Sequence, residues 1–435
     1  VMVVEWLLVL WEYNPKASPE KSPSPRRGEF GERSIIWRSC WDLGLLLAGL
    51  TYFVLGNLPP GPDGLMWIVT PVMLTVMAGV LRDRGPFSYP RQTCAWLSLL
   101  GLLCVQKMLI FSAPAVWLLS LGIATVAMVV NTRYLRHPIS AAVTVGFGLG
   151  AINVAIFDRF SLSLSDWFAV WASLGLLLWL FAARFRQRPP STLPRLYAQA
   201  AAGWANALCV WNLGWLTWHS IAVFDRVQSP SVVAVVAIGL TIVGLGVRSG
   251  GYPDNWTLYG LGWALELLAI EGLRFFSVAP IGLILVNLAL GLVLQLLGDW
   301  WLRRTARPLP SGWHVIPLLY GGLATLLRLD LVEAWTGFVT LGYAAIAIGI
   351  GRRYSATKPL IYIGLVGVSV AAYELLWYRM VGWDAGDRFV AFAALGASIL
   401  YLYRVLTGPL MGYLRLSAAA VHGFAHVHWG ARSIA

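Results

Sequence analysis

The sequence consists largely of uninterrupted apolar runs that are long enough to cross a lipid bilayer. The run from Ile139 to Phe157, for example, contains no charged residue. An α-helix rises about 1.5 Å per residue and the hydrocarbon core is about 30 Å thick, so about 20 such residues span it. Transmembrane β-strands would be about ten residues long with alternating polarity, which these runs lack. The pattern therefore predicts an all-α, polytopic transmembrane helix bundle.

Fifteen such runs follow one another, which predicts about 14–15 spans. They lie at residues 38–57, 64–82, 93–111, 114–132, 139–157, 164–183, 196–219, 230–247, 256–276, 278–298, 312–328, 333–350, 359–380 and 388–406, with a last one starting near residue 414. Hydrophobic residues make up 58% of the 435-residue chain, charged residues only 12%, and the mean hydropathy is +0.69. This composition excludes a soluble enzyme, a disulfide scaffold, a coiled coil and a disordered chain.

Basic residues gather in every second connection, which orients the predicted helices. The basic connections lie at residues 133–137, 184–195, 303–307 and 352–358. Connections with acids or balanced charges lie between them, at residues 58–63, 158–166, 225–229 and 384–388. Cytoplasmic loops of membrane proteins are enriched in Lys and Arg. We therefore expect the basic connections on the cytoplasmic side, and they explain the net charge of +12 better than nucleic-acid binding does.

Composition divides the chain into seven segments. Residues 14–34 are rich in Pro, Ser and charged residues, which predicts a cytoplasmic linker. The other expected segments are a short interfacial or partial helix at 1–13, a first transmembrane hairpin at 35–92, four-helix units at 93–193, 194–309 and 310–408, and the start of a further helix at 409–435. Because the chain begins without Met and ends inside an apolar pattern, we expect it to belong to a longer polypeptide.

The three four-helix units are predicted from features that recur in phase. Proline and basic linkers separate the units, and the third helix of each contains a polar residue inside its apolar run: Asn153, Glu271 and Glu374. Tyr259 and Tyr362 each precede the glutamate of their helix by twelve residues. Recurrence of this kind indicates an internal repeat. The alternative is the ordinary rhythm of apolar segments and loops.

Ionisable residues inside the apolar runs are the main candidates for function. A charged group inside a bilayer costs at least about 2.5 kcal/mol, so it is paired, protonated or faces a polar cavity. Glu271 has Arg274 three residues later, and Glu374 has Arg379 five residues later. These neighbours favour structural ion pairs over the coupling of protons or substrate. Glu266 is placed more deeply in the membrane and has no local basic partner.

His422, His426 and His428 form the only histidine cluster with ligand-like spacing, since the first two are one helical turn apart. No acidic partner and no His-Glu-x-x-His motif accompanies them. We interpret them as a polar stripe at the start of the last helix, and ligation of a metal or a porphyrin by His422 and His426 is the alternative. The sequence predicts no other cofactor, no other metal site and no catalytic residue.

Most of the 23 tryptophans cluster at the ends of the predicted helices, which is typical of the aromatic belt at the lipid headgroups. Those well inside their runs, where we expect packing against neighbouring helices, are Trp96, Trp179, Trp204, Trp211 and Trp263. Glycines inside the runs, such as Gly364 and Gly367, predict close approach of helices.

The stretch from Lys358 to Leu375, KPLIYIGLVGVSVAAYEL, together with Arg415-Leu416-Ser417 and His426-Val427-His428-Trp429, resembles large polytopic membrane proteins of unknown function found in cyanobacteria. The resemblance covers the C-terminal quarter of the chain. It implies a longer parent chain and a location in the plasma or thylakoid membrane. It supplies no catalytic residues.

Three classes of function fit such a chain. A structural or assembly subunit of a membrane complex, which binds lipid and other membrane proteins, needs no site and is the preferred interpretation. A multi-span transporter is favoured by repeated units and intramembrane carboxylates, although short, polar-interrupted helices in matching positions of two halves are not evident. A membrane enzyme of lipid-linked saccharide metabolism would need paired acids in an early outer loop, where residues 57–64 contain only Asp63. An enzyme is therefore the least favoured class.

Overall fold

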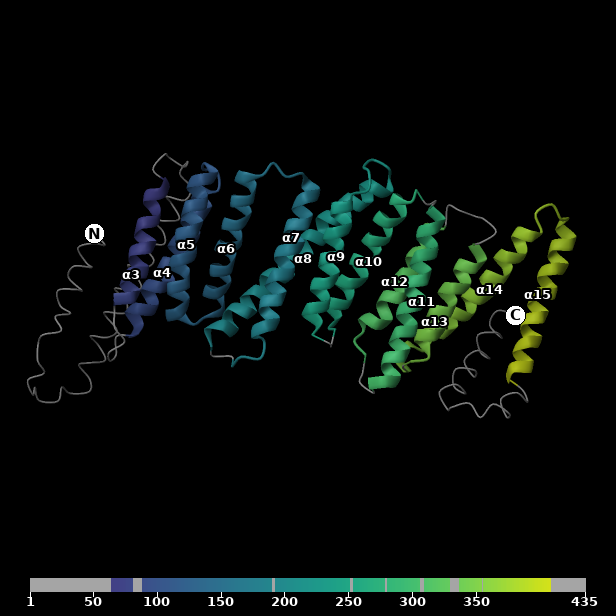
Figure 1. The fold of residues 1–435 in the computed structure, drawn as a ribbon. Coiled ribbons are helices and arrows are strands. Elements are labelled where there is room, and N and C mark those ends of the chain that lie inside the picture. Colours follow the sequence, from purple (N-terminus) through teal and green to yellow (C-terminus); the bar gives the residue numbers. More distant parts are fainter. Residues whose placement is uncertain are drawn as a thin grey trace, which may run out of the picture. The chain divides into compact units, whose positions relative to one another are not determined.

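The computed structural model describes residues 64–80, 88–189, 192–250, 253–277, 280–305, 309–328, 336–353 and 355–407. Within these ranges the chain forms thirteen α-helices and two short 3-10 helices, and no strand (Figure 1). The predicted all-α fold is therefore confirmed. The segments expected at residues 1–13, 14–34 and 409–435 lie outside the described residues.

The helices follow one another with short connections. In chain order they are η1 (Gly64–Ile68), α3 (Val69–Val80), α4 (Ser88–Leu109), α5 (Pro114–Leu135), α6 (Pro138–Arg159), α7 (Leu164–Phe185), α8 (Leu193–Phe224), α9 (Val232–Ser249), α10 (Asn255–Phe275), α11 (Pro280–Thr305), α12 (Gly312–Leu327), α13 (Thr336–Gly351), η2 (Ser355–Thr357), α14 (Pro359–Arg379) and α15 (Ala385–Thr407).

Eight of the described helices are long and apolar enough to cross a membrane. They are α4, α5, α6, α7, α8, α9, α11 and α14, and shorter apolar helices lie at Leu65–Val80, Gly312–Leu327 and Thr336–Gly351. The chain is therefore an integral membrane protein with several transmembrane helices, as the apolar runs predict.

The connection between α5 and α6 illustrates how local sequence ends one helix and starts the next. Arg136 adopts the left-handed conformation, with φ 46°, and its backbone N–H donates to Thr132 O. His137 follows as the N-cap, and its side chain accepts a hydrogen bond from Ile139 N. Pro138 then occupies the first helical turn, where no N–H donor is needed.

The chain divides into two compact units. The first contains residues up to Leu162 together with Arg184–Trp204, and the second contains Ser163–Ala183 and everything from Ala205 onward. Four α-helices fall in each of the three predicted four-helix units, α4–α7, α8–α11 and α12–α15, to within five residues at the boundaries. The superposition of these units stays a prediction.

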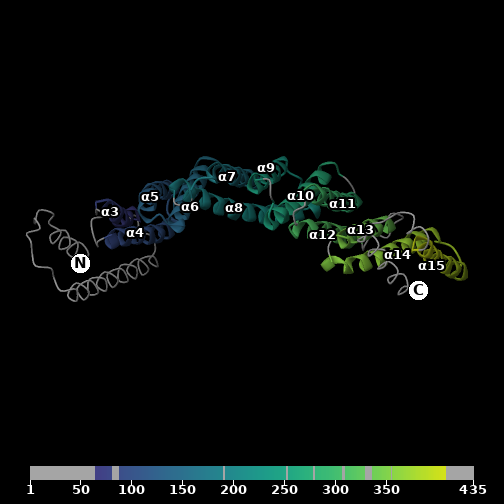
Figure 2. The same cartoon turned by 90° about the horizontal axis from the view of Figure 1, so that it is seen from below.

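In the first unit, α3, α4, α5 and α6 enclose an apolar core with a small polar centre. α5 packs against α6 and against both α3 and α4, and the pair α5 and α6 lies side by side in Figures 1 and 2. Asn131 of α5 donates to Thr75 Oγ1 of α3 at 3.1 Å and to Ser98 Oγ of α4 at 2.9 Å. Gln106 Nε2 of α4 donates to Ser120 Oγ of α5 at 2.7 Å. Amide and hydroxyl groups thus join these helices without using charge.

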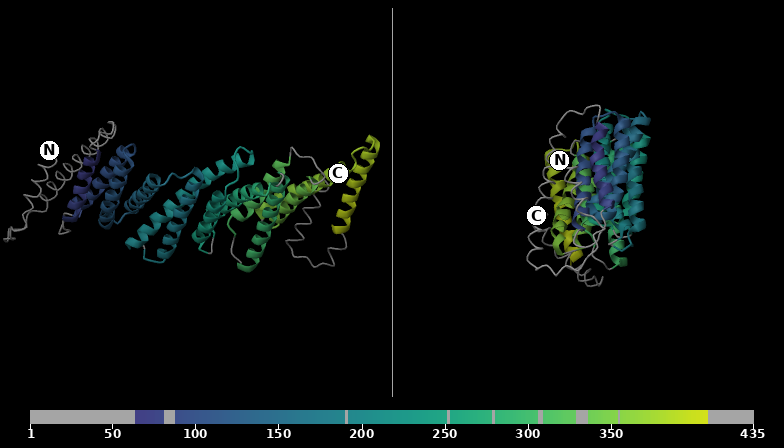
Figure 3. Two further views of the ribbon diagram at one scale, coloured as in Figure 1. Left: turned by 45° about the horizontal axis from the view of Figure 1, so that its top comes forward. Right: turned by 90° about the vertical axis from the view of Figure 1, so that its left-hand side faces the viewer.

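In the second unit, glycines allow the closest helix contacts. The most extensive helix pairing is the α13–α14 hairpin, which belongs to the green to yellow-green part of the chain in Figure 3. A Cβ on Gly364 of α14 would lie 2.8 Å from Ala344 O and 2.5 Å from Ile348 Cγ1, both on α13. The expected role of Gly364 in close packing is therefore confirmed. α11 packs against α12 and α13.

Two glycine contacts of the second compact unit join equivalent pairs of helices in the predicted repeat. Gly244 of α9 faces the Trp179 ring of α7, where an added Cβ would come within 2.5 Å. Gly349 of α13, 105 residues later, faces Gln295 of α11, 116 residues after Trp179. In both cases the last helix of one predicted four-helix unit meets the second helix of the next.

Candidate functional site

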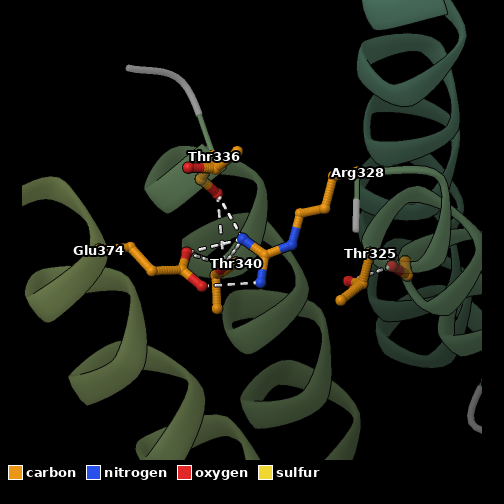
Figure 4. Close-up of polar contacts among 6 residues, drawn as sticks. Thr325, Arg328, Thr336, Thr340 and Glu374 are labelled. Atoms are coloured by element: carbon orange, nitrogen blue, oxygen red, sulfur yellow. Dashed lines mark hydrogen bonds and ion pairs between the residues drawn. The ribbon is translucent and has the colours of Figure 1, made fainter. Parts of the chain in front are cut away.

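Glu374 lies in α14 at the centre of a polar cluster formed by three helices (Figure 4). Arg328 donates from Nη1 to Glu374 Oε2 at 2.6 Å and from Nη2 to Oε1 at 2.8 Å. The Thr340 hydroxyl donates to Oε2 at 2.7 Å. Arg328 Nη1 also donates to Thr336 O at 2.8 Å and to Thr340 Oγ1. Both carboxylate oxygens are therefore occupied by donors.

The three helices contribute to this cluster at a common level. Arg328 is the C-cap residue of α12, a position where a positive charge is favourable next to the carbonyl end of the helix. Thr336 and Thr340 belong to the first turns of α13, and Glu374 lies fifteen residues after Pro359, about 22 Å along α14. Figure 4 shows the Arg328 side chain reaching past the start of α13 to the carboxylate.

The geometry of the Arg328–Glu374 pair is typical of a structural ion pair that holds helices together. The guanidinium is a planar fork that matches a carboxylate with two parallel hydrogen bonds. The side chains of Arg328 and Glu374 are 12% and 28% exposed, so both are largely buried. A carboxylate held by two guanidinium nitrogens and a hydroxyl has little capacity left to exchange a proton. The arrangement ties α12, α13 and α14 together.

Glu271 of α10 occupies a related site with different partners. Its side chain is fully buried, and Oε1 accepts from Ser220 Oγ at 3.2 Å while Oε2 accepts from Ser231 N at 3.3 Å. His219 Nε2 lies 3.4 Å from Oε1, which is an ion-pair distance rather than a hydrogen bond. The other ring nitrogen of His219 contacts Gln228 Oε1 at 2.8 Å.

Glu271 and Glu374 make equivalent connections within their helix groups. Each lies on the third helix of a predicted four-helix unit, and the two are 103 residues apart. Each contacts the end of the first helix, through His219 and Ser220 of α8 or through Arg328 after α12. Each also reaches the beginning of the second helix, directly at the N-cap of α9 or through the first turns of α13.

The local ion pairs expected from sequence spacing are wrong. Glu374 pairs with Arg328 rather than with Arg379, which is exposed on the same helix. Glu271 pairs with His219, while Arg274 donates to Phe224 O and lies over the Phe224 ring. The reason is geometric, because both carboxylates face neighbouring helices rather than their own helix surface.

Asn153 of α6 is the neutral counterpart in the first predicted unit. Its Nδ2 donates to Leu149 O of the same helix at 2.8 Å. The third-helix residue is therefore an amide in the first predicted four-helix unit, and a carboxylate that contacts the two preceding helices occurs in the second and third.

Glu266 of α10 has a neutral partner. Asn287 Nδ2 of α11 donates to Glu266 Oε1 at 3.0 Å. Glu266 Oε2 and Asn287 Oδ1 are both buried and have no hydrogen-bond partner among the described residues. No ion pair involving Glu266 occurs in the described part of the chain.

Arg353 lies in the expected basic connection after α13, and its side chain is buried between helices. Its side chain is 3% exposed, and Nε donates to Asp299 Oδ1 of α11 at 2.7 Å. Nη1 donates to Trp313 O of α12 at 3.2 Å, and Nη2 donates to Gln295 O of α11. This arginine therefore joins α11 and α12 to the end of α13.

No group of three His, Cys, Asp or Glu side chains that could hold a metal ion occurs among the described residues. His422, His426 and His428 lie outside the described ranges, so the interpretation of that cluster stays a prediction.

Comparisons with protein-family models, with curated proteins and with solved structures found no match to this chain.

Three site residues were missed by the sequence analysis: Arg328, His219 and Asn287. A signal for Arg328 was present, because a positive charge within the apolar run at 312–328 calls for a specific acidic partner. Asn287 is an amide within an apolar run, where polar side chains are expensive and need partners. His219 carries no distinct signal in the sequence, because a histidine next to Trp218 near the end of an apolar run also fits a position at the membrane interface.

Proposed function

We propose that the protein is a structural or assembly subunit of a membrane complex, in which intramembrane carboxylates hold helices together. The observation that supports this most is the Glu374 cluster, where both carboxylate oxygens accept hydrogen bonds from Arg328 and Thr340. A coupling carboxylate must change its protonation state and its contacts during each cycle. A carboxylate tied to two other helices at once is suited to a fixed role.

Exposed tryptophans support binding of lipid and of other membrane proteins. Trp167, Trp171, Trp211 and Trp215 form a continuous indole cluster on α7 and α8 of the second unit, with successive ring centroids 5.8, 6.2 and 6.0 Å apart. Trp211 is 55% exposed and Trp215 37% exposed. Tryptophan is favoured both at lipid interfaces and in protein interfaces because its ring is amphipathic. In this proposal the basic connections face the cytoplasm.

A transporter is the second candidate, and Glu266 is the observation that favours it. Unlike Glu271 and Glu374, this acid contacts a neutral amide and has no basic partner among the described residues. Acids of this kind inside membrane proteins mark ion or proton pathways.

The test compares proton flux in proteoliposomes for the parent protein and the Glu374→Gln and Glu266→Gln variants. For a structural subunit we expect no flux above that of protein-free liposomes in the parent, and therefore no difference between the three proteins. Flux in the parent that disappears in Glu374→Gln protein of normal thermal stability would contradict the structural role. Flux lost only in the Glu266→Gln variant would favour the transporter.

A further inference from the structure

Glu266 of α10 and Asn287 of α11 form a buried polar contact between two helices. Both residues lie well inside their helices, Glu266 eleven residues after the start of α10 and Asn287 seven residues after the start of α11. Asn287 is 0% exposed. One hydrogen bond joins them, from Asn287 Nδ2 to Glu266 Oε1 at 3.0 Å. The remaining two oxygens, Glu266 Oε2 and Asn287 Oδ1, are buried acceptors for which the described residues provide no donor.

Among the residues that the structure describes, no positive group pairs with Glu266. On α12, the Tyr320 hydroxyl donates to Gly262 O of α10. On α10 itself, Arg274 donates to Phe224 O of α8, and Glu271 is held by His219 of α8. Arg248 of α9 is paired with Asp254 near the opposite end of α10. An ionised Glu266 would therefore be a largely buried negative charge with a single amide donor, an arrangement that is strongly unfavourable.

A carboxylic acid and a primary amide are complementary. The acid O–H can donate to the amide oxygen while the amide N–H donates to the acid carbonyl, which closes a ring with two hydrogen bonds. In this pair the second bond is already present, and the two atoms without a partner are those that the first bond would join. A proton on Glu266 Oε2 therefore supplies a donor of the kind that these two oxygens lack, and it removes the negative charge.

We propose that Glu266 and Asn287 form a proton-binding site between α10 and α11. Glu266 carries the proton on Oε2, and this O–H donates a hydrogen bond to Asn287 Oδ1. The proton comes from the aqueous phase, the carboxylate becomes a neutral carboxylic acid, and no other reactant takes part. The acid–amide pair of the second predicted four-helix unit, residues 194–309, has no equivalent at the corresponding position of the third. Glu271 is matched 103 residues later by Glu374, whereas the residue 103 positions after Glu266 is Ser369, whose hydroxyl donates to Leu365 O.

Infrared spectroscopy of the membrane-reconstituted protein at neutral pH tests this assignment. We expect a carbonyl band of a protonated carboxylic acid that disappears in the Glu266→Gln variant and is retained in Glu374→Gln. Replacing the partner, in Asn287→Leu, should move the band to the higher frequency of a carboxylic acid without hydrogen bonds. A parent spectrum without a band that depends on Glu266 would overturn the proposal.

Thermal stability provides a second test that separates this site from the ion pair. Glutamine can form the same two-bond ring with Asn287 that a protonated glutamate forms, so Glu266→Gln should unfold at the same temperature as the parent. Marked destabilisation by Glu266→Gln would show that the charged form is the native one and would contradict the proposal. The infrared spectrum is recorded both with and without sodium. If the site binds a small cation, the carboxylic acid band is absent in sodium buffer and present without sodium. That result would also overturn proton binding.

Discussion

Arg328 and Glu374, 46 positions apart in the sequence, form a bidentate ion pair that joins the end of α12 to α14. The ion pair lies next to the start of α13, and the Thr340 hydroxyl of that helix donates a further hydrogen bond to Glu374. Removing one partner leaves the other charge without compensation in a largely buried place. The contribution of the ion pair to the free energy of unfolding can therefore be measured by substituting each residue.

A double-mutant cycle on Arg328→Gln and Glu374→Gln should reveal strong coupling. Each single variant should destabilise the solubilised protein by about 2–3 kcal/mol, below the upper range for fully buried pairs because both side chains are partly exposed. The double variant should lose less than the sum of the two. Thermal unfolding in mild detergent measures this. Arg379→Gln, an exposed residue of the same helix, is the control and should change stability by less than about 0.5 kcal/mol.

The α13–α14 hairpin should be sensitive to one added methyl group. Gly364→Ala places a Cβ 2.8 Å from the backbone oxygen of Ala344, so the helices must separate, and we expect a loss of about 1–3 kcal/mol. The control is Gly322→Ala in α12, where nothing lies within 4 Å of the added Cβ. It should be neutral or stabilising, since alanine favours helix over glycine by up to about 1 kcal/mol. Equal stability of the two variants would contradict the close contact.

Two tryptophans at different exposures should respond differently to truncation. Trp179 is 3% exposed and packs in the core of the second unit, so Trp179→Ala should cost about 3–5 kcal/mol. Trp211 is 55% exposed, and Trp211→Ala should change the unfolding temperature little. If Trp211→Ala instead proved as damaging as Trp179→Ala, the exposed cluster would have to be part of the folded core.

Asp254, the N-cap of α10, should contribute stability that acid removes. Burial alone would raise the pKa of Asp254, but hydrogen bonds from Thr257 and the charge of Arg248 outweigh it and lower the pKa below its usual value. A lowered pKa in the folded state means that the contribution is complete above about pH 3.9, the ordinary value, and is lost as the pH falls through the lower folded pKa. Asp254→Asn keeps the cap and removes the charge.

The stability difference between parent and Asp254→Asn protein should therefore be largest near neutral pH and shrink in acid. Thermal unfolding of both proteins across a pH series measures it. A difference that grew on acidification would reverse the sign of the pKa shift.

The orientation of the chain is tested by labelling single cysteines from outside intact cells. In a variant without the four native cysteines, a cysteine at position 384 should react with a membrane-impermeant reagent, and one at position 186 should react only after permeabilisation. Reaction at 186 alone in intact cells would reverse the predicted topology.

Much of the secondary structure could be predicted from local sequence. The apolar run at 139–157 corresponds to α6, Pro138–Arg159, because the length of an uninterrupted apolar segment decides whether a helix can satisfy its backbone inside a bilayer. Pro138 and Pro359 lie in the first turns of their helices, as proline requires. Gly364 was correctly associated with close packing for a similarly local reason, since only a residue without a side chain lets two backbones approach.

The partners of the polar residues could not be predicted in this way. Glu374 was expected near Arg379 because residues close in sequence share a helix surface, yet its partner is Arg328, at the end of another helix. The same applies to Glu266 and Asn287, which belong to two different apolar runs and lie 21 positions apart in the sequence. Local hydropathy and segment length are properties of the sequence, so they suffice to identify the helices that can lie in a membrane. Which buried polar groups meet depends on the rotation and depth at which whole helices pack against each other, so these contacts become known only from the folded arrangement.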